Sequence, residues 1–110
     1  MATISQDKAI LGARKHAALE GYEFLGMAGE RLLACLDNDD IVFAEVTYGE
    51  GEFGEPTYKR EDFERLAMSY VFNNKELVDK KIRFDTIGLA VTPEGDRAMV
   101  RHHVNCMEKD

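Results

Sequence analysis

The segment Ile41-Val42-Phe43-Ala44-Glu45-Val46-Thr47 constrains the fold more than any other part of this sequence. Six of its seven residues are apolar or β-branched, and turn-forming residues lie on both sides of it. Such a run is typical of a buried strand. Glutamate is uncommon in strands and is costly to bury without a partner. We therefore interpret Glu45 either as a functional ligand or as an acid that has a buried partner.

The length of 110 residues predicts a single domain spanning residues 1–110. A hydrophobic content of 45% is enough to build a core. No apolar stretch approaches the roughly 20 residues that a membrane-spanning helix needs, and the N-terminus has no apolar signal-peptide core. We therefore expect a cytoplasmic protein in which Cys35 and Cys106 are buried, reduced thiols.

The net charge of −7 is concentrated in one part of the chain. Residues 37–64 contain ten acids and only two bases, Lys59 and Arg60, so the rest of the sequence is about neutral. A phosphate-binding surface should be basic, so this distribution counts against nucleic acid near Glu45. Residues 49–56 form a glycine-rich acidic loop. We interpret it as a solvated connection, with a cation-attracting rim beside Glu45 as the alternative.

Two segments predict helices. Ser5 is a suitable N-cap for a helix that runs to about Glu20, and Gly21 provides the stop. His16 lies on this helix, and we interpret it as a surface or edge histidine. A second helix is predicted over 57–73, with Lys59 and Arg60 in a first turn where the helix dipole does not favour cations. Its core-facing stripe comprises Phe63, Leu66, Ala67, Tyr70 and Val71.

Five segments predict strands, namely 21–25, 30–36, 41–48, 80–91 and 97–105. The acidic stretch 37–40 begins like a calcium loop but lacks the later ligands of that motif, so we interpret it as a hairpin turn. The resulting order is α-β-β-β-α-β-β. This order predicts an α/β domain in which a mixed sheet is flanked by helices.

The predicted hairpin also sets a register. If residues 38 and 39 form the turn, Leu36 pairs with Ile41 and Leu32 lies opposite Glu45. Glu30 would then lie opposite Thr47, and all four side chains at positions 30, 32, 45 and 47 would share one face of the sheet. Glu30 and Glu45 would be diagonal neighbours, close enough for long side chains to meet at one cation.

The remaining polar residues and the cysteines are weaker candidates for a functional site. His102 and His103 are adjacent, so on a strand they point to opposite faces and cannot chelate one ion together. Arg83 and Asp85 share a strand face, which predicts an ordinary ion pair. Neither cysteine has an assigned base that would make it a nucleophile.

Several pieces of the sequence, taken in order, resemble the YraN-like family of uncharacterised bacterial proteins. That family has the restriction-endonuclease-like, PD-(D/E)xK nuclease fold, and the α-β-β-β-α-β-β order read above agrees with the core of that fold. The matching pieces span most of the chain between Gly21 and Asn105. They are Gly21-Tyr22, Gly29-Glu30, Val42-Phe43-Ala44-Glu45-Val46, Phe53-Gly54-Glu55-Pro56, Arg83-Phe84-Asp85 and His102-His103-Val104-Asn105.

The resemblance implies a metal site that this sequence has largely lost. In the family, an aspartate and the Glu-x-Lys of the next strand hold Mg²⁺ and activate water. The aspartate position is Leu32 here, and the lysine position is Thr47. Glu45 alone keeps its type, with Glu30 nearby. Acidic residues also replace the basic residues that the family tends to place after its lysine.

We therefore expect a nuclease-fold protein with a degenerate, catalytically inactive site, which needs no cofactor and acts by binding. The partner is nucleic acid by family resemblance, with Lys59, Arg60 and Arg83 as candidate contacts, or else a protein or a second copy of the chain. No membrane partner is expected.

Two alternatives remain. One is a divergent Mg²⁺-dependent nuclease that uses Glu30 and Glu45 together with a loop acid such as Glu50 or Glu52. In this alternative, Lys59 or Arg60 takes the place of the missing lysine. The other is an acidic protein-interaction module. The sequence leaves the substrate, the partner and the oligomeric state open.

Overall fold

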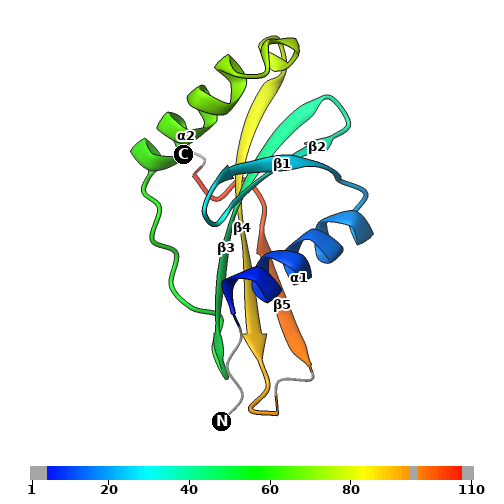
Figure 1. Ribbon diagram of the computed structural model, residues 1–110, viewed down its shortest axis with the longest axis vertical. Helices are drawn as coiled ribbons and strands as arrows, with labels where there is room; N and C mark the ends of the chain where they lie inside the picture. Colours follow the sequence, from blue (N-terminus) through cyan, green and yellow to red (C-terminus); the bar gives the residue numbers. More distant parts are fainter. Residues whose placement is uncertain (1–4, 95–96, 108–110) are drawn as a thin grey trace.

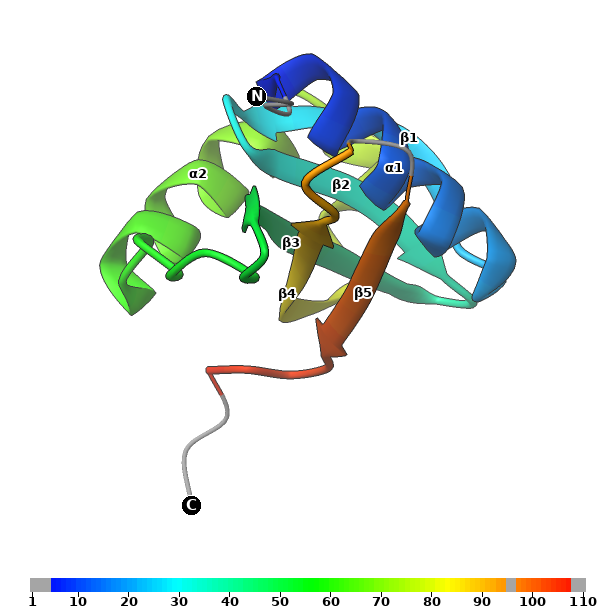
Figure 2. The same cartoon turned by 90° about the horizontal axis from the view of Figure 1, so that it is seen from below.

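A five-stranded sheet with one helix on each face forms the centre of the molecule (Figures 1 and 2). The computed structural model describes residues 5–94 and 97–107. The elements in chain order are α1 (Gln6–Leu19), β1 (Glu23–Gly29), β2 (Leu32–Asp37), β3 (Asp40–Glu50), α2 (Arg60–Phe72), the 3-10 turn η1 (Lys75–Leu77), β4 (Lys81–Val91) and β5 (Ala98–His103). The predicted α/β class and element order are confirmed, with η1 as an addition.

The sheet has the simple strand order β1-β2-β3-β4-β5. β1, β2 and β3 form an antiparallel meander, β4 runs parallel to β3, and β5 returns antiparallel to β4. The parallel pair needs a crossover connection, which α2 supplies. β3 is therefore the central strand, which pairs with β4 along its whole length and with β2 from Asp40 to Glu45. Figure 1 shows β3 and β4 running together along the long axis.

Each helix covers its own core. Ala9, Ala13 and Ala17 of α1 recur at helical spacing and bury small side chains, so the helix lies close against the sheet. On the other face, Phe63, Ala67 and Val71 of α2 pack over Leu32, Ala34, Ile41 and Phe43. The predicted stripe of the second helix is confirmed. Because the sheet is covered on both faces, the strands at its centre are apolar on both sides.

Local signals explain the ends of α1 and of the hairpin. The Ser5 hydroxyl accepts from the Lys8 N–H at 3.2 Å, and Gly21 after the helix has a positive φ of 88°. Leu36 pairs with Ile41 and Asp37 with Asp40, as predicted, and Asn38 adopts a positive φ of 56° in the two-residue turn between them.

Several predicted boundaries were wrong. β1 does not end at Gly26 but continues, with register shifts, to Gly29. Gly26 has no side chain, which leaves room for Tyr70 of α2 to pack against the strand. A Cβ at Gly26 would lie 3.0 Å from the Tyr70 hydroxyl. α2 begins at Arg60, three residues later than predicted, and β5 is shorter at both ends.

No helix among the described residues is long and apolar enough to cross a membrane.

Candidate functional site

Glu45 is completely buried, and its carboxylate is bound within the protein. The Thr57 N–H donates to Oε2 at 2.8 Å, and the Thr57 hydroxyl contacts the same oxygen at 3.2 Å. The Tyr58 N–H lies 3.3 Å from both carboxylate oxygens. Glu45 therefore holds the extended segment that leads into α2. These contacts use the N–H groups of Thr57 and Tyr58, and Lys59 is the N-cap whose N–H donates to Asp62, so the helix begins only at Arg60.

Arg31, whose side chain is partly exposed, is the partner of Glu45 that the sequence left unidentified. Its Nη1 lies 3.2 Å from Glu45 Oε2 and donates to the Val46 carbonyl at 3.1 Å, while Nη2 donates to the Thr57 hydroxyl at 2.6 Å. The guanidinium also lies 5.1 Å from the centre of the Tyr58 ring. The positive charge beside Glu45 is thus a fixed side chain of the same chain.

The predicted face of the sheet exists, but it does not include Glu30. Leu32 is directly opposite Glu45 in the register and is fully buried against α2, and Thr47 is almost fully buried two residues further along β3. The strand pairing begins at Leu32. Glu30 lies in the exposed turn between β1 and β2, where its backbone carbonyl accepts from the side chain of Gln6. Its predicted pairing with Thr47 was wrong.

The three candidate contacts for phosphate do not form one surface. Lys59 and Arg60 lie at the start of α2, where Arg60 donates to the Met107 carbonyl at 2.5 Å and lies near Glu64. Arg83 lies on β4 among side chains of the opposite face of the sheet, with its guanidinium bonded to Asp85, Asp37 and Tyr22. The chain therefore does not combine these three cations into one basic patch.

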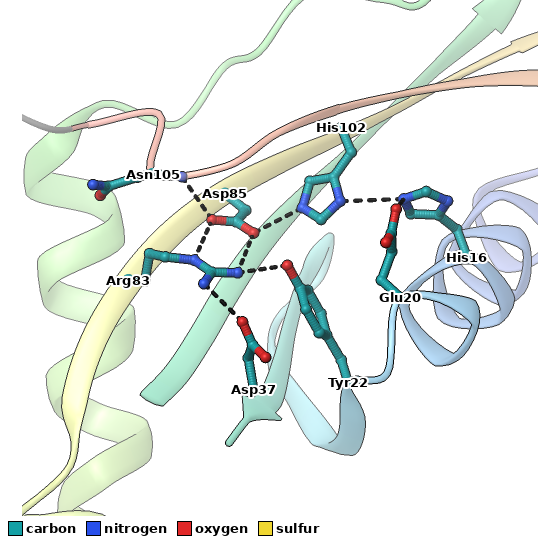
Figure 3. A network of polar contacts seen from close by, with 8 residues as sticks. All are labelled: His16, Glu20, Tyr22, Asp37, Arg83, Asp85, His102 and Asn105. Carbon is teal, nitrogen blue, oxygen red and sulfur yellow. Dashed lines mark hydrogen bonds and ion pairs between the residues drawn. The ribbon is translucent and has the colours of Figure 1, made fainter. Parts of the chain in front are cut away.

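A second buried acid, Asp85, organises a larger polar network on the α1 side of the sheet (Figure 3). Arg83 donates to both of its oxygens at 3.0 and 3.1 Å, which confirms the predicted ion pair. His102 Nε2 lies 2.7 Å from Oδ2, and the Asn105 N–H donates to Oδ1 at 2.8 Å. Burial alone would raise the pKa of Asp85, but these hydrogen bonds hold it below its ordinary value.

The network continues from His102 to the last turn of α1. His102 Nδ1 lies 3.1 Å from His16 Nε2, and the same nitrogen of His16 lies 3.6 Å from a carboxylate oxygen of Glu20. Burial and the neighbouring His102 lower the pKa of His16, while Glu20 opposes that shift. His16 is therefore not a simple surface histidine. It forms the contact between α1 and β5.

Both cysteines are free thiols, as predicted, but only Cys35 is buried, whereas Cys106 is partly exposed. Cys35 belongs to the core under α1, whereas Cys106 packs against the core under α2. Burial, with a smaller effect of Asp85, raises the pKa of each thiol to about 11. Such thiols are protonated and poorly nucleophilic at neutral pH.

No protein-family model and no curated protein matches this chain. The family resemblance therefore stays a prediction. The geometry itself separates the two buried acids: Glu45 joins β3 to the segment before α2, and Asp85 joins β4 to β5 and α1.

Sequence reasoning identified Glu45 and Asp85 as acids of interest but missed the contacts of His16, Glu20 and His102. The helical spacing of His16 and Glu20 was a usable signal, because residues four apart lie on the same helix face. Placing His102 beside them requires the tertiary packing of β5 against α1.

Proposed function

We propose that this chain is a nuclease-fold domain in which an internal ion pair has replaced the metal-dependent cleavage site, and that it acts by binding a protein partner. The observation that carries the proposal is the Glu45 carboxylate, which accepts hydrogen bonds from Arg31 and from two backbone N–H groups. A carboxylate with these partners has little capacity left for Mg²⁺, which also demands near-octahedral oxygen ligands.

The surroundings of Glu45 support this proposal. The element order is the one expected from the resemblance, and Leu32 lies opposite Glu45 with Thr47 two residues further along β3. The resemblance matches these two positions to the aspartate and the lysine of the family. Leucine offers no ligand atom, and threonine carries no positive charge. The Arg31 guanidinium provides a permanent cation that balances the one carboxylate retained.

Charge favours a protein over nucleic acid as the partner. The chain has a net charge of −7, and Arg83 is already neutralised by Asp37 and Asp85. A nucleic-acid site would have to overcome this negative field, because binding to phosphates draws on uncompensated cations. The free thiols agree with the expected cytoplasmic compartment.

The surface that suits a partner lies along α2 and the beginning of β4. Ala67, Met68, Ile82 and Phe84 line an apolar groove with Glu64 at its edge. Met68 and Ile82 are about half exposed, and Phe72 and Val78 are exposed nearby in the sequence. A contiguous apolar groove with exposed side chains, such as the one between Met68 and Ile82, is typical of an interaction site. A neighbouring hollow at the start of β4 is lined by Asp39, Asp40, Glu76, Asp79, Lys80 and Lys81. The occupant that fits is a basic, amphipathic segment of another protein.

Cleavage is tested directly with the full chain and with single-stranded, double-stranded and branched DNA and RNA, in millimolar Mg²⁺ or Mn²⁺. We expect no cleavage and no movement of the Glu45 carboxyl resonance in NMR. Metal-dependent cleavage that is lost in Glu45→Gln and in Glu30→Gln would establish the divergent nuclease and overturn the proposal.

Binding is tested with a basic amphipathic peptide and a second peptide that has the same apolar residues but acidic charges. We expect the basic peptide alone to shift the methyl resonances of Met68 and Ile82, and Met68→Glu to abolish the shift. Leu11→Glu is the matched control, because Leu11 is a similarly exposed apolar residue on α1. Salt-dependent binding of DNA or RNA, without binding of either peptide, would refute a protein partner.

A further inference from the structure

Three potential metal ligands converge where the last turn of α1 meets β5 (Figure 3). Their ligand atoms, His16 Nε2, Glu20 Oε1 and His102 Nδ1, all lie within 4.8 Å of one another. Two elements bring them together. His16 and Glu20 are one helical turn apart, and His102 points from β5 toward α1 while the adjacent His103 is exposed.

The hydrogen bonds determine which atoms carry lone pairs. The ionised carboxylate of Asp85 only accepts, so His102 Nε2 carries the proton directed at it, across 2.7 Å. His102 Nδ1 is then an acceptor in the neutral ring, and Glu20 is an acceptor as well. His16 Nε2 faces both, at 3.1 and 3.6 Å. Two acceptors thus surround a single N–H, and a cation that replaced this proton would have three ligands.

The spacing suits a tetrahedral ion. Two ligand atoms about 2.0–2.1 Å from one Zn²⁺ lie about 3.3 Å apart at the tetrahedral angle. The two separations from His16 Nε2, 3.1 Å to His102 Nδ1 and 3.6 Å to Glu20 Oε1, are on either side of that value. The remaining pair, His102 Nδ1 and Glu20 Oε1, lies within 4.8 Å, so closure around one ion requires the Glu20 side chain to move toward His102. The His102 and His16 side chains are 9% and 19% exposed, and that of Glu20 is 52% exposed. A fourth position can therefore face water.

The surroundings of His102 match those of a metal-binding histidine. Such a ligand commonly donates its second N–H to a carboxylate, which fixes the tautomer and the ring orientation. Asp85 accepts in this way, and it is itself held by Arg83 and by the backbone of Asn105. This arrangement orients Nδ1 toward α1 before any ion arrives.

We propose that His16, Glu20 and His102 form a binding site for Zn²⁺, with Asp85 as the positioning residue for His102 and with water at the fourth position. Imidazole nitrogens together with a carboxylate suit zinc and related transition ions, whereas Mg²⁺ and Ca²⁺ prefer oxygen ligands. The site lies on the opposite face of the sheet from Glu45 and is independent of the function proposed above.

The test measures Zn²⁺ affinity of the metal-free full chain, without a histidine tag, by competition with a chromophoric chelator. We expect one Zn²⁺ per chain at micromolar concentration, with affinity at least tenfold lower in His16→Gln and in Glu20→Gln. His103→Gln and Cys106→Ser are the matched controls, and we expect both to retain the wild-type affinity. Glu20 is half exposed, so the fold of its variant should be intact, which an NMR spectrum checks.

The coordination is tested with Co²⁺ as a substitute for zinc. We expect the intense visible bands of four-coordinate cobalt in the wild-type chain. In Asp85→Asn we expect shifted bands and affinity lower by about 10–100-fold, with partial recovery in Asp85→Glu. The inference is overturned if no stoichiometric Zn²⁺ binds, if His16→Gln and Glu20→Gln bind as tightly as the wild type, or if Cys106→Ser removes the binding.

Discussion

At the scale of single residues, this protein keeps two carboxylates in its interior by saturating them with donors. Glu45 and Asp85 are both completely buried, and each has a guanidinium and at least one backbone N–H as partners. Among the described residues, no buried side-chain nitrogen or oxygen lacks a hydrogen-bond partner. Burial of an acid is tolerated in this way because the interior donors replace the lost water.

Glu45→Ala should destabilise the fold strongly. The substitution leaves the N–H groups of Thr57 and Tyr58 without their acceptor and Arg31 without its counter-charge, so we expect a loss of about 3–5 kcal/mol in the free energy of unfolding. Urea denaturation measures it. Glu55→Ala, at an exposed position on the neighbouring loop, should change stability by less than about 0.5 kcal/mol. Equal effects of the two substitutions would contradict the structural role of Glu45.

The thiols should react slowly in the native state. With the pKa of Cys35 and of Cys106 raised to about 11, only a small fraction of either thiol is thiolate at pH 8, and burial further limits access to Cys35. We expect alkylation by iodoacetamide at pH 8 to be at least about tenfold slower than in the urea-unfolded chain, and to accelerate as pH rises toward 11. Equally fast alkylation of the native and unfolded chains at pH 8 would show that these thiols are neither buried nor perturbed.

At the scale of elements, the loop after β3 exposes its acids, as expected of a solvated connection, but packs closely against neighbouring strands at Phe53 and Gly54. Gly54 has a φ of 76°, and a Cβ there would lie 2.7 Å from the Tyr48 carbonyl oxygen. Phe53 packs beside Gly88 of β4, and the Arg101 guanidinium of β5 lies 4.5 Å from the centre of the Phe53 ring. The loop thus contacts β3, β4 and β5 before the chain reaches Thr57 and Tyr58, which bind Glu45.

Gly54→Ala and Gly51→Ala form a matched pair that tests this packing. Both glycines have positive φ, but a Cβ at Gly51 meets nothing within 4 Å. Gly51→Ala should cost only the backbone strain, about 1–2 kcal/mol, whereas Gly54→Ala should cost clearly more because the Cβ would collide with the Tyr48 backbone. Thermal unfolding of both variants measures the difference. If the two variants have the same stability, the loop does not approach β3 as described.

At the scale of the whole molecule, two separate cores share one sheet, and the most protected backbone is at its centre. β2, β3 and β4 carry nearly all of the fully buried strand residues, whereas β5 is exposed along most of its length. Local opening should therefore begin at the edges, because few buried contacts hold them.

Native-state hydrogen exchange should reproduce this gradient. We expect amides of Ile41–Val46 in β3 to exchange only through global unfolding, and amides of Val100 and Arg101 in β5 to exchange through local opening at lower free energy. Equal protection across the sheet would show that β5 is held by contacts beyond those described. Addition of Zn²⁺ should raise the protection of β5 selectively if the His16–Glu20–His102 site forms.

The sequence by itself determined the elements whose signals are local. The spacing of the apolar residues predicted the core-facing stripe of α2, an apolar run between turn residues predicted the central strand, Ser5 and Gly21 predicted the bounds of α1, and the hairpin turn set the pairing of Leu32 with Glu45. Only the tertiary structure decided what the polar residues do. Arg31 pairs with Glu45, and His102 contacts His16. Both contacts depend on where the helices pack and on the order of the strands in the sheet. Arg83 and Asp85 lie two residues apart on one strand, so the sequence predicted their ion pair. Partners that are distant in the chain leave no periodic pattern in the sequence, so their contacts are decided only when the sheet and the helices pack together.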